Sequence, residues 1–233
     1  MTINITVPAL DVVLPWLPRL GSAALLTIAL FLVVVTLSGA SGLAMALLEL
    51  PRERIATRRF FSVFSWLFRG IPELVVLLIC FLGLPQIGLE LGPVQSAVLG
   101  FWLVGCAYDY QVFRGALRSV PAGQYEAGRA LGLGQWQLLR CVVIPQMFRI
   151  ALGPWATYAV GALKRMSIAS AVSVSEVMYV SKQAISATGK PFEFIFLAFA
   201  LYASIGSVLL GIELLVARRV DYLKRASDQL VVA

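Results

Sequence analysis

The stretch Leu20–Glu49 reads LGSAALLTIALFLVVVTLSGASGLAMALLE, and it decides the class of fold. No charged residue occurs before Glu49, and only Ser, Thr and Gly interrupt the apolar side chains. A bilayer core about 30 Å thick needs roughly 20 apolar residues in a helix. This run, which extends to Leu50, therefore predicts a membrane-spanning helix.

The rest of the chain repeats this pattern. The 233 residues are 60% hydrophobic and 13% charged, with a mean hydropathy of +0.87, whereas soluble domains carry roughly 25% charged residues. Further apolar runs occupy Phe60–Leu82, Val94–Phe113, Met147 to at least Leu163, and Phe192–Ala217. We therefore predict an all-α integral membrane protein with about five transmembrane helices.

The positions of Lys and Arg predict the orientation, because cytoplasmic loops carry an excess of them. With the N-terminus outside, 13 of the 19 basic residues face the cytoplasm. They are Arg52, Arg54, Arg58, Arg59, Arg114, Arg118, Arg129, Arg140, Arg149, Arg218, Arg219, Lys224 and Arg225. Arg19, Lys182 and Lys190 lie outside, and Arg69, Lys164 and Arg165 lie within apolar runs. We expect an N-out, C-in protein with a periplasmic segment 1–19 and a cytoplasmic tail 220–233.

The chain lacks the residues that several classes of function require. The chain has no histidine, which removes Ser-His and Cys-His triads and most zinc chemistry. Cys80, Cys106 and Cys141 are widely spaced and show no metal or redox pattern. No G-x-x-x-x-G-K-[ST] loop is present to hold ATP phosphates. We expect no catalytic residue, metal or cofactor in this chain, and no nucleic-acid partner.

The longest inner segment, about 118–146, is too polar to span a membrane. Ser119 is placed to cap a helix whose first turn holds Pro121. Gly132 predicts the end of that helix through a left-handed backbone. A second short helix, Gln135–Val143, is expected to stop at Pro145. The alternative interpretation is an ordinary interfacial loop.

This segment also carries a family pattern. The segment resembles the EAA loop of ABC-transporter permeases in its residues and their spacing. Glu126-Ala127-Gly128 is followed after three residues by Gly132, after nine more by Val142, and after one more by Ile144 and Pro145. Other elements in the same order resemble the polar-amino-acid (histidine/glutamine-type) branch, and they cover roughly Gly21 to Arg219. They are Arg69-Gly70-Ile71-Pro72, Ala107-Tyr108, Phe113-Arg114-Gly115, Ser119–Gln124, Leu163-Lys164 and Ser167-Ile168-Ala169-Ser170.

The resemblance implies a type I importer fold over 20–219 and a set of partners. A solute-binding protein outside the bacterial inner membrane delivers the solute, and two permease subunits form the path. Two ATPase subunits hold ATP and Mg. Glu126, Ala127, Gly128, Gly132 and Pro145 would then form the coupling helix that docks on the ATPase.

An ionisable side chain inside a membrane costs free energy, so each one in an apolar run is expected to have a partner or a function. Arg69 and Glu73 are spaced i, i+4 and are expected to pair. Lys164 and Arg165 precede small and hydroxyl residues, which favours a broken helix at a cavity. Snorkelling, or pairing with Glu176 or Asp109, is the alternative for this double cation. The expected substrate path contains Arg69, Glu73, Asp109, Gln111, Lys164, Arg165 and Ser167.

The chain departs from the family pattern mildly in the EAA loop, at Gly128 and Val142, and at four positions inside the apolar runs or next to them. Arg165 and Met166 replace an Asp and a Thr that are common in the family, Gln111 replaces a common Glu, and Asp109 replaces an apolar residue. These changes argue against a free cationic substrate resting at Arg165. They favour a substrate with an extra carboxylate, or a subunit that leaves binding to a different partner permease. An opine or compatible-solute importer, a non-translocating scaffold and an intramembrane enzyme are the rival functions.

Overall fold

The computed structural model describes residues 10–50 and 55–232, and the surroundings of side chains as far as residue 218. Within those ranges the chain is helical and holds no β-strand, which confirms the predicted class. Residues 1–9 of the predicted outer segment lie outside the described residues. So do Arg52 and Arg54 and the side chains of Arg219, Lys224 and Arg225.

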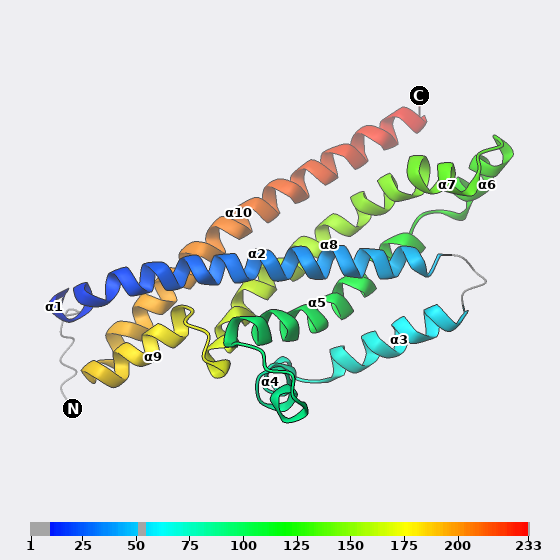
Figure 1. Cartoon of the computed structure of the whole chain (residues 1–233). Helices are drawn as coiled ribbons and strands as arrows, with labels where there is room; N and C mark the ends of the chain where they lie inside the picture. Colours follow the sequence, from blue (N-terminus) through cyan, green and yellow to red (C-terminus); the bar gives the residue numbers. More distant parts are fainter. Residues whose placement is uncertain (1–9, 51–54, 233) are drawn as a thin grey trace.

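Long helices lie side by side and form an elongated bundle (Figure 1). Helix α2 (Leu17–Leu48) packs against α5 (Pro93–Arg118), which packs against α8 (Ile144–Arg165). Helix α10 (Pro191–Val232) packs against α8. Short α1 (Leu10–Val13) and α9 (Val177–Thr188) lie at one end. Helices α6 (Ala122–Ala130) and α7 (Gln135–Leu138) lie at the other, together with the C-terminus.

Two stretches of the described residues are long and apolar enough to cross a bilayer, Asp11–Leu48 and Pro191–Arg218. A third qualifies if the bent segment from Ile55 to Ile87 counts as one span. Helices α5 and α8 cover the other predicted runs and extend beyond them. The structure therefore supports a helical membrane protein, while the number of five spans stays a prediction.

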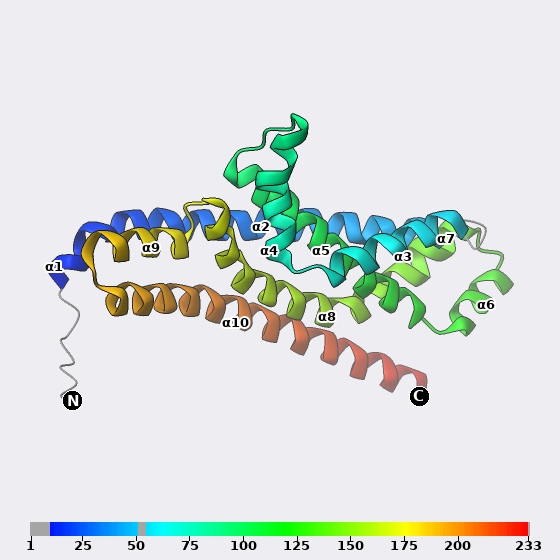
Figure 2. The same cartoon turned by 90° about the horizontal axis from the view of Figure 1, so that it is seen from below.

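The predicted span Phe60–Leu82 is sharply bent at Pro72. Helix α3 (Ile55–Gly70) and the stretch Glu73–Ile87 meet at an angle of 101°. Pro72 has ψ 133°, an extended backbone, and the proline ring keeps the preceding residue out of the α region. A new helix, α4 (Glu73–Leu78), begins after the break and continues as a π-helix (Ile79–Gly83) and a 3₁₀ turn (Leu84–Ile87). This segment projects from the side of the bundle (Figure 2).

Helix α6 ends as the sequence predicted. Gly132 has φ +75°, and its N–H donates to the Arg129 carbonyl at 2.9 Å. The Leu133 N–H donates to the Gly128 carbonyl at 3.1 Å, which completes a Schellman motif. The predicted Ser119 cap is wrong, because Ser119 ends α5 and donates its hydroxyl to the Gly115 carbonyl. α6 begins at Ala122 instead.

The predicted stop at Pro145 is also wrong. α7 passes through a π-helix (Leu139–Val143) directly into α8, and Pro145 lies in the first turn of α8. A proline inside a helix removes one hydrogen bond and clashes with the carbonyl four residues earlier. The wider π turn just before Pro145 makes room for the ring, so the chain stays helical.

Beyond Arg165 the helix breaks, as the small residues indicated. A 3₁₀ helix (Met166–Val172) ends at Ser173, which has φ +61°. Glu176 then caps α9 by accepting the N–H groups of Met178 and Tyr179. Helix α9 runs to Thr188, and Gly189 makes the turn into α10.

The bundle is held by a close approach of α2 and α5 at Gly42, in the last third of α2. A Cβ on Gly42 would lie 2.6 Å from the Asp109 Cβ and 2.7 Å from the Tyr110 backbone nitrogen. Small residues allow helices in membranes to approach this closely. Among the cysteines, Cys80 and Cys106 are buried, whereas Cys141 is exposed on the π-helix before α8.

Candidate functional site

The end of the bundle that carries α6 and α7 presents a compact protrusion, which we call the knuckle (residues 121–138). Gly128 is the contact point between its two helices, since a Cβ there would lie 2.3 Å from the Leu138 Cδ1. The absence of a side chain therefore lets α6 rest on α7. Burial raises the pKa of the Tyr125 phenol above its ordinary value.

The knuckle exposes apolar side chains at its tip. Leu131 is 80% exposed and Trp136 is 69% exposed. Glu126 and Ala127 are also exposed on α6, and Pro145 is exposed below the knuckle. A rigid helix pair with exposed Leu and Trp is typical of a protein contact surface. Nothing in the sequence distinguished Leu131 and Trp136 as exposed, because α6 and α7 are too short to show a pattern of buried and exposed positions.

A second site lies inside the bundle, where α2, α4, α5 and α8 meet. The Arg165 Nε lies 2.9 Å from the Glu73 Oε1. Ser38 donates to the Asp109 Oδ2 at 2.6 Å. Glu73 Oε2, Asp109 Oδ1 and Trp155 Nε1 are buried and have no hydrogen-bond partner among the described residues. All five residues line one cavity of about 10 Å³, which is room for about one water molecule.

The predicted pairing of Arg69 with Glu73 is wrong. The break at Pro72 places the two residues on different helices, so the i, i+4 geometry no longer exists. The Arg69 guanidinium instead lies over the Tyr108 ring, 5.3 Å from its centre. Tyr108 stacks on Tyr158 with 5.1 Å between ring centres. The Arg165 guanidinium covers Tyr158 at 4.6 Å, so the two arginines enclose a stacked tyrosine pair.

The structure brings some of the predicted path residues together and leaves others apart. Glu73, Asp109 and Arg165 line the cavity, and Arg69 reaches it through the two tyrosines. Gln111 donates to the Ser65 hydroxyl at 2.9 Å. Lys164 is exposed, and Ser167 donates to the Lys164 carbonyl at 3.0 Å. The alternative pairing of Arg165 with Glu176 or Asp109 is replaced by its ion pair with Glu73.

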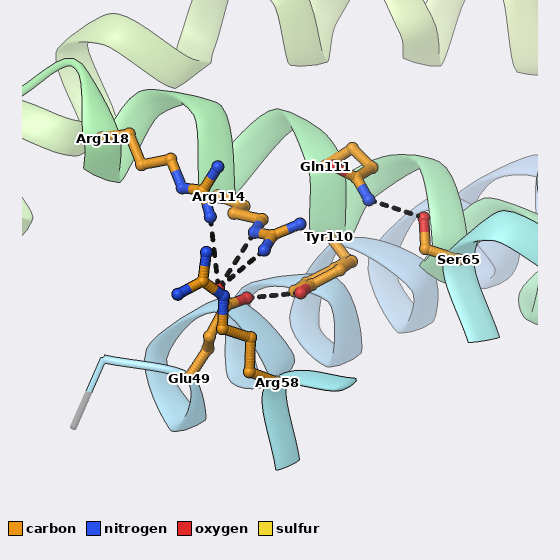
Figure 3. A network of polar contacts seen from close by, with 7 residues as sticks. All are labelled: Glu49, Arg58, Ser65, Tyr110, Gln111, Arg114 and Arg118. Atoms are coloured by element: carbon orange, nitrogen blue, oxygen red, sulfur yellow. Dashed lines mark hydrogen bonds and ion pairs between the residues drawn. The ribbon is translucent and has the colours of Figure 1, made fainter. Parts of the chain in front are cut away.

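A third polar cluster was missed by the sequence analysis (Figure 3). Glu49, at the end of α2, receives three guanidinium groups on its Oε1. They belong to Arg58 of α3 and to Arg114 and Arg118 of α5, at 3.3, 3.0 and 3.6 Å. The Tyr110 hydroxyl donates to Glu49 Oε2. The sequence shows only that Glu49 is a carboxylate near many arginines, and this does not indicate which of them pair with it.

The bundle, the broken helix around a polar cavity and the protruding knuckle define a helical membrane transport subunit. The chain belongs to the family described as binding-protein-dependent transport system inner membrane component, which matches residues 39–222. The predicted family resemblance is confirmed, and the coupling residues lie within the matched range, as do Glu73, Asp109, Trp155 and Arg165 of the cavity.

Several similar proteins are permeases of amino-acid ABC transporters. The chain is 41% identical to the probable amino-acid ABC transporter permease YckA of Bacillus subtilis over 114 residues, 49% of this chain and about half of YckA (50%). It is 30% identical to the histidine/lysine/arginine/ornithine permease HisM of Salmonella typhimurium over 173 residues, 68% of this chain and 74% of HisM. It is 30% identical to the arginine ABC transporter permease ArtQ of Haemophilus influenzae over 197 residues, 82% and 88% of the two chains.

Solved structures agree with the fold. A chain of an amino acid ABC transporter crystallised with histidines has a TM-score of 0.84 and 26% identity, covering 92% of this chain and 100% of that one. The MetNI methionine ABC transporter in an inward-facing form has a TM-score of 0.75 and 19% identity, covering 88% and 98%. The latter likeness concerns the fold alone.

Proposed function

We propose that this chain is the permease subunit of an ATP-driven importer for amino acids or related polar solutes. The observation that carries the proposal is the EAA pattern, which falls on a protruding knuckle whose Gly132 adopts the left-handed backbone. The relatives named above are amino-acid ABC permeases, which supports the amino-acid class. The opine or compatible-solute importer stays as the alternative.

The proposed topology has five spans, formed by α2, the bent α3–α4 segment, α5, α8 and α10, with the N-terminus outside the bacterial inner membrane. It is supported by the gathering of Arg58, Arg114 and Arg118 at the end of the bundle that carries the knuckle and the C-terminus. The transmembrane domain would cover 20–219, with the segment 1–19 outside and the tail 220–233 in the cytoplasm.

The proposed assembly contains an ATPase dimer that holds ATP and Mg, a second permease subunit and an external binding protein. In this assembly Glu126, Ala127, Gly128, Gly132 and Pro145 couple the chain to the ATPase. Leu131 and Trp136 would add apolar contact area to that interface. ATPase closure then moves the knuckle as a rigid body, and the continuous helix through Pro145 carries the motion into α8.

The coupling assignment is tested at Gly132 by two substitutions at the same position. Asn tolerates a left-handed backbone and Val does not. In proteoliposomes that contain the assembled transporter and its binding protein, we expect Gly132→Asn to retain uptake of labelled substrate. Gly132→Val should lower the uptake rate at least about tenfold, which corresponds to an increase of about 1.4 kcal/mol in the activation free energy. Full-rate uptake by Gly132→Val would contradict the assignment.

The proposed path includes Arg69, Glu73, Asp109, Gln111, Lys164, Arg165 and Ser167. In the structure its centre is narrow, because the Glu73–Arg165 ion pair occupies it and about 10 Å³ of space is left. Translocation therefore requires this pair to separate. The same observation favours a second candidate, in which this subunit leaves substrate binding to a different permease subunit.

Arg165→Ala distinguishes these two candidates. If the pair gates a path that substrate passes, removing the guanidinium changes the uptake rate or KM of the assembled transporter. If the partner permease alone binds substrate, affinity stays unchanged and only stability falls. Arg140→Ala, an exposed arginine outside the cavity, is the matched control.

A further inference from the structure

A large groove separates the knuckle from the helices above it. It has a volume of about 1430 Å³ and lies between the end of α2, the start of α3, the end of α5 and the knuckle. It is distinct from the small cavity at Glu73, which is enclosed by other residues. Neither the coupling role nor the solute path accounts for it.

The groove carries a surplus of positive charge. Among the described residues, five arginines line it against two glutamates, an excess of three positive charges. The arginines are Arg58, Arg59, Arg114, Arg118 and Arg129, and the glutamates are Glu49 and Glu126.

Three of these guanidiniums gather on one oxygen atom, Oε1 of Glu49 (Figure 3). One carboxylate cannot neutralise three guanidiniums. The side chains of Arg58 and Arg118 are 57% and 56% exposed, so their remaining N–H groups face the groove and its opening. Planar guanidiniums in this arrangement match the oxygens of a phosphate group.

An apolar strip begins where the basic groove ends. Val63 lines the groove, and it is exposed together with Phe60, Trp66 and Leu67 on the outer face of α3. A ligand that suits both surfaces has an anionic head and an apolar tail. An acidic protein segment would satisfy the arginines but would leave this strip uncovered.

We propose that the groove binds the phosphate headgroup of an anionic phospholipid, with its acyl chains along α3. Basic pockets between transmembrane helices at the cytoplasmic side are suited to such headgroups. The phosphate oxygens contact Arg58 and Arg118, while Arg114, whose side chain is 15% exposed, keeps Glu49 paired. The inference depends on the membrane topology proposed above and is independent of the imported solute.

The test uses the assembled transporter in nanodiscs made of equal parts phosphatidylglycerol and phosphatidylcholine. Native mass spectrometry counts the lipids that stay bound to it. We expect the wild type to retain phosphatidylglycerol preferentially. Because each arginine near an anionic surface contributes about a fivefold factor, Arg58→Gln with Arg118→Gln should reduce this preference by about 25-fold.

The matched control removes the same charge elsewhere. Arg140 and Arg149 are exposed and do not line the groove, so Arg140→Gln with Arg149→Gln should leave the preference unchanged. If the Arg58/Arg118 variant does not assemble, Arg59→Gln with Arg129→Gln replaces it, since these residues line the groove and leave the Glu49 ion pairs intact.

Four results would overturn the proposal. One is the absence of a phosphatidylglycerol preference in the wild type. Another is an equal loss in the groove and control variants, which indicates diffuse surface charge. The third is displacement of the lipid by millimolar glycerol 3-phosphate, because a soluble phosphate that competes this well shows that the acyl chains along α3 contribute nothing. An unchanged preference in the groove variants also refutes the site.

Discussion

At the scale of single residues, the lack of a side chain at Gly42 allows α2 and α5 to pack closely. A methyl group there would meet the backbone of α5 at Asp109 and Tyr110, and a backbone cannot rotate away as a flexible side chain can. Ser38, one turn earlier on α2, donates to Asp109 across the same contact. Gly42 therefore sets the distance between the two helices and the position of a carboxylate in the cavity.

We expect Gly42→Ala to destabilise the protein by about 1–3 kcal/mol, the usual range for overpacking, because α2 and α5 must separate. Gly21→Ala is the matched control, since it lies on the same helix and its Cβ would meet nothing within 4 Å. Thermal unfolding of both variants in the same detergent measures the difference. Equal stability of the two variants would contradict the close contact seen at Gly42.

At the scale of elements, α3 is attached to α5 by a buried serine. The Ser65 hydroxyl donates to the Ala107 carbonyl at 3.0 Å and accepts from the Gln111 side chain at 2.9 Å. Most of the other side chains of α3 are exposed or half-buried. Because the break at Pro72 separates α3 from α4, this contact and the Glu49 cluster hold α3 against the bundle.

Ser65→Ala should therefore loosen α3 and leave α5 intact. Hydrogen bonds between membrane helices contribute about 0.6 kcal/mol on average and up to about 1.7, so a loss of about 1 kcal/mol is expected. Hydrogen exchange should become faster at the amides of α3. Ser204→Ala on α10 serves as the control, because this exposed hydroxyl bonds only within its own helix. Unchanged exchange in α3 would show that Ser65 does not attach it.

The elements also show what the sequence could predict. Apolar runs and the spacing of Glu126, Gly132 and Pro145 predicted the helices, the knuckle and the family, because these signals are local. The partner of Glu73 was not predictable in this way. It follows from the exact angle of the break at Pro72 and from the position of Arg165 on a distant helix.

A wrong prediction and a missed cluster likewise depend on structure that the local sequence does not show. Pro145 was expected to end a helix because a proline does so in an α-helix, and the π turn before it was not visible in the sequence. The three arginines around Glu49 come from two helices, and only the packed bundle shows which arginines converge.

At the scale of the whole molecule, Glu49 joins three helices at the end that carries the knuckle. Its carboxylate is the common partner of arginines from α3 and α5, and it extends α2 at its C-terminal end. Removing this charge leaves the guanidiniums facing one another. The end of the bundle that carries the knuckle should then open, while the contact between α2 and α5 at Gly42 stays closed.

Glu49→Gln is expected to lower the unfolding temperature of the assembled transporter and to widen the α3–α5 separation, measured between spin labels on exposed positions of the two helices. Adding Arg118→Gln to this variant should restore part of the lost stability, because it removes one of the repelling charges. If the double variant is less stable than Glu49→Gln alone, charge repulsion is not the cause.

The unequal exposure of the three cysteines has a practical consequence. Cys80 and Cys106 are buried, whereas Cys141 is open on the π-helix that connects the knuckle to α8. The unaltered chain therefore carries one accessible thiol at the place where ATPase motion would enter the membrane helices. A maleimide fluorophore attached there would report each turnover as a change in emission, with no substitution made to the protein.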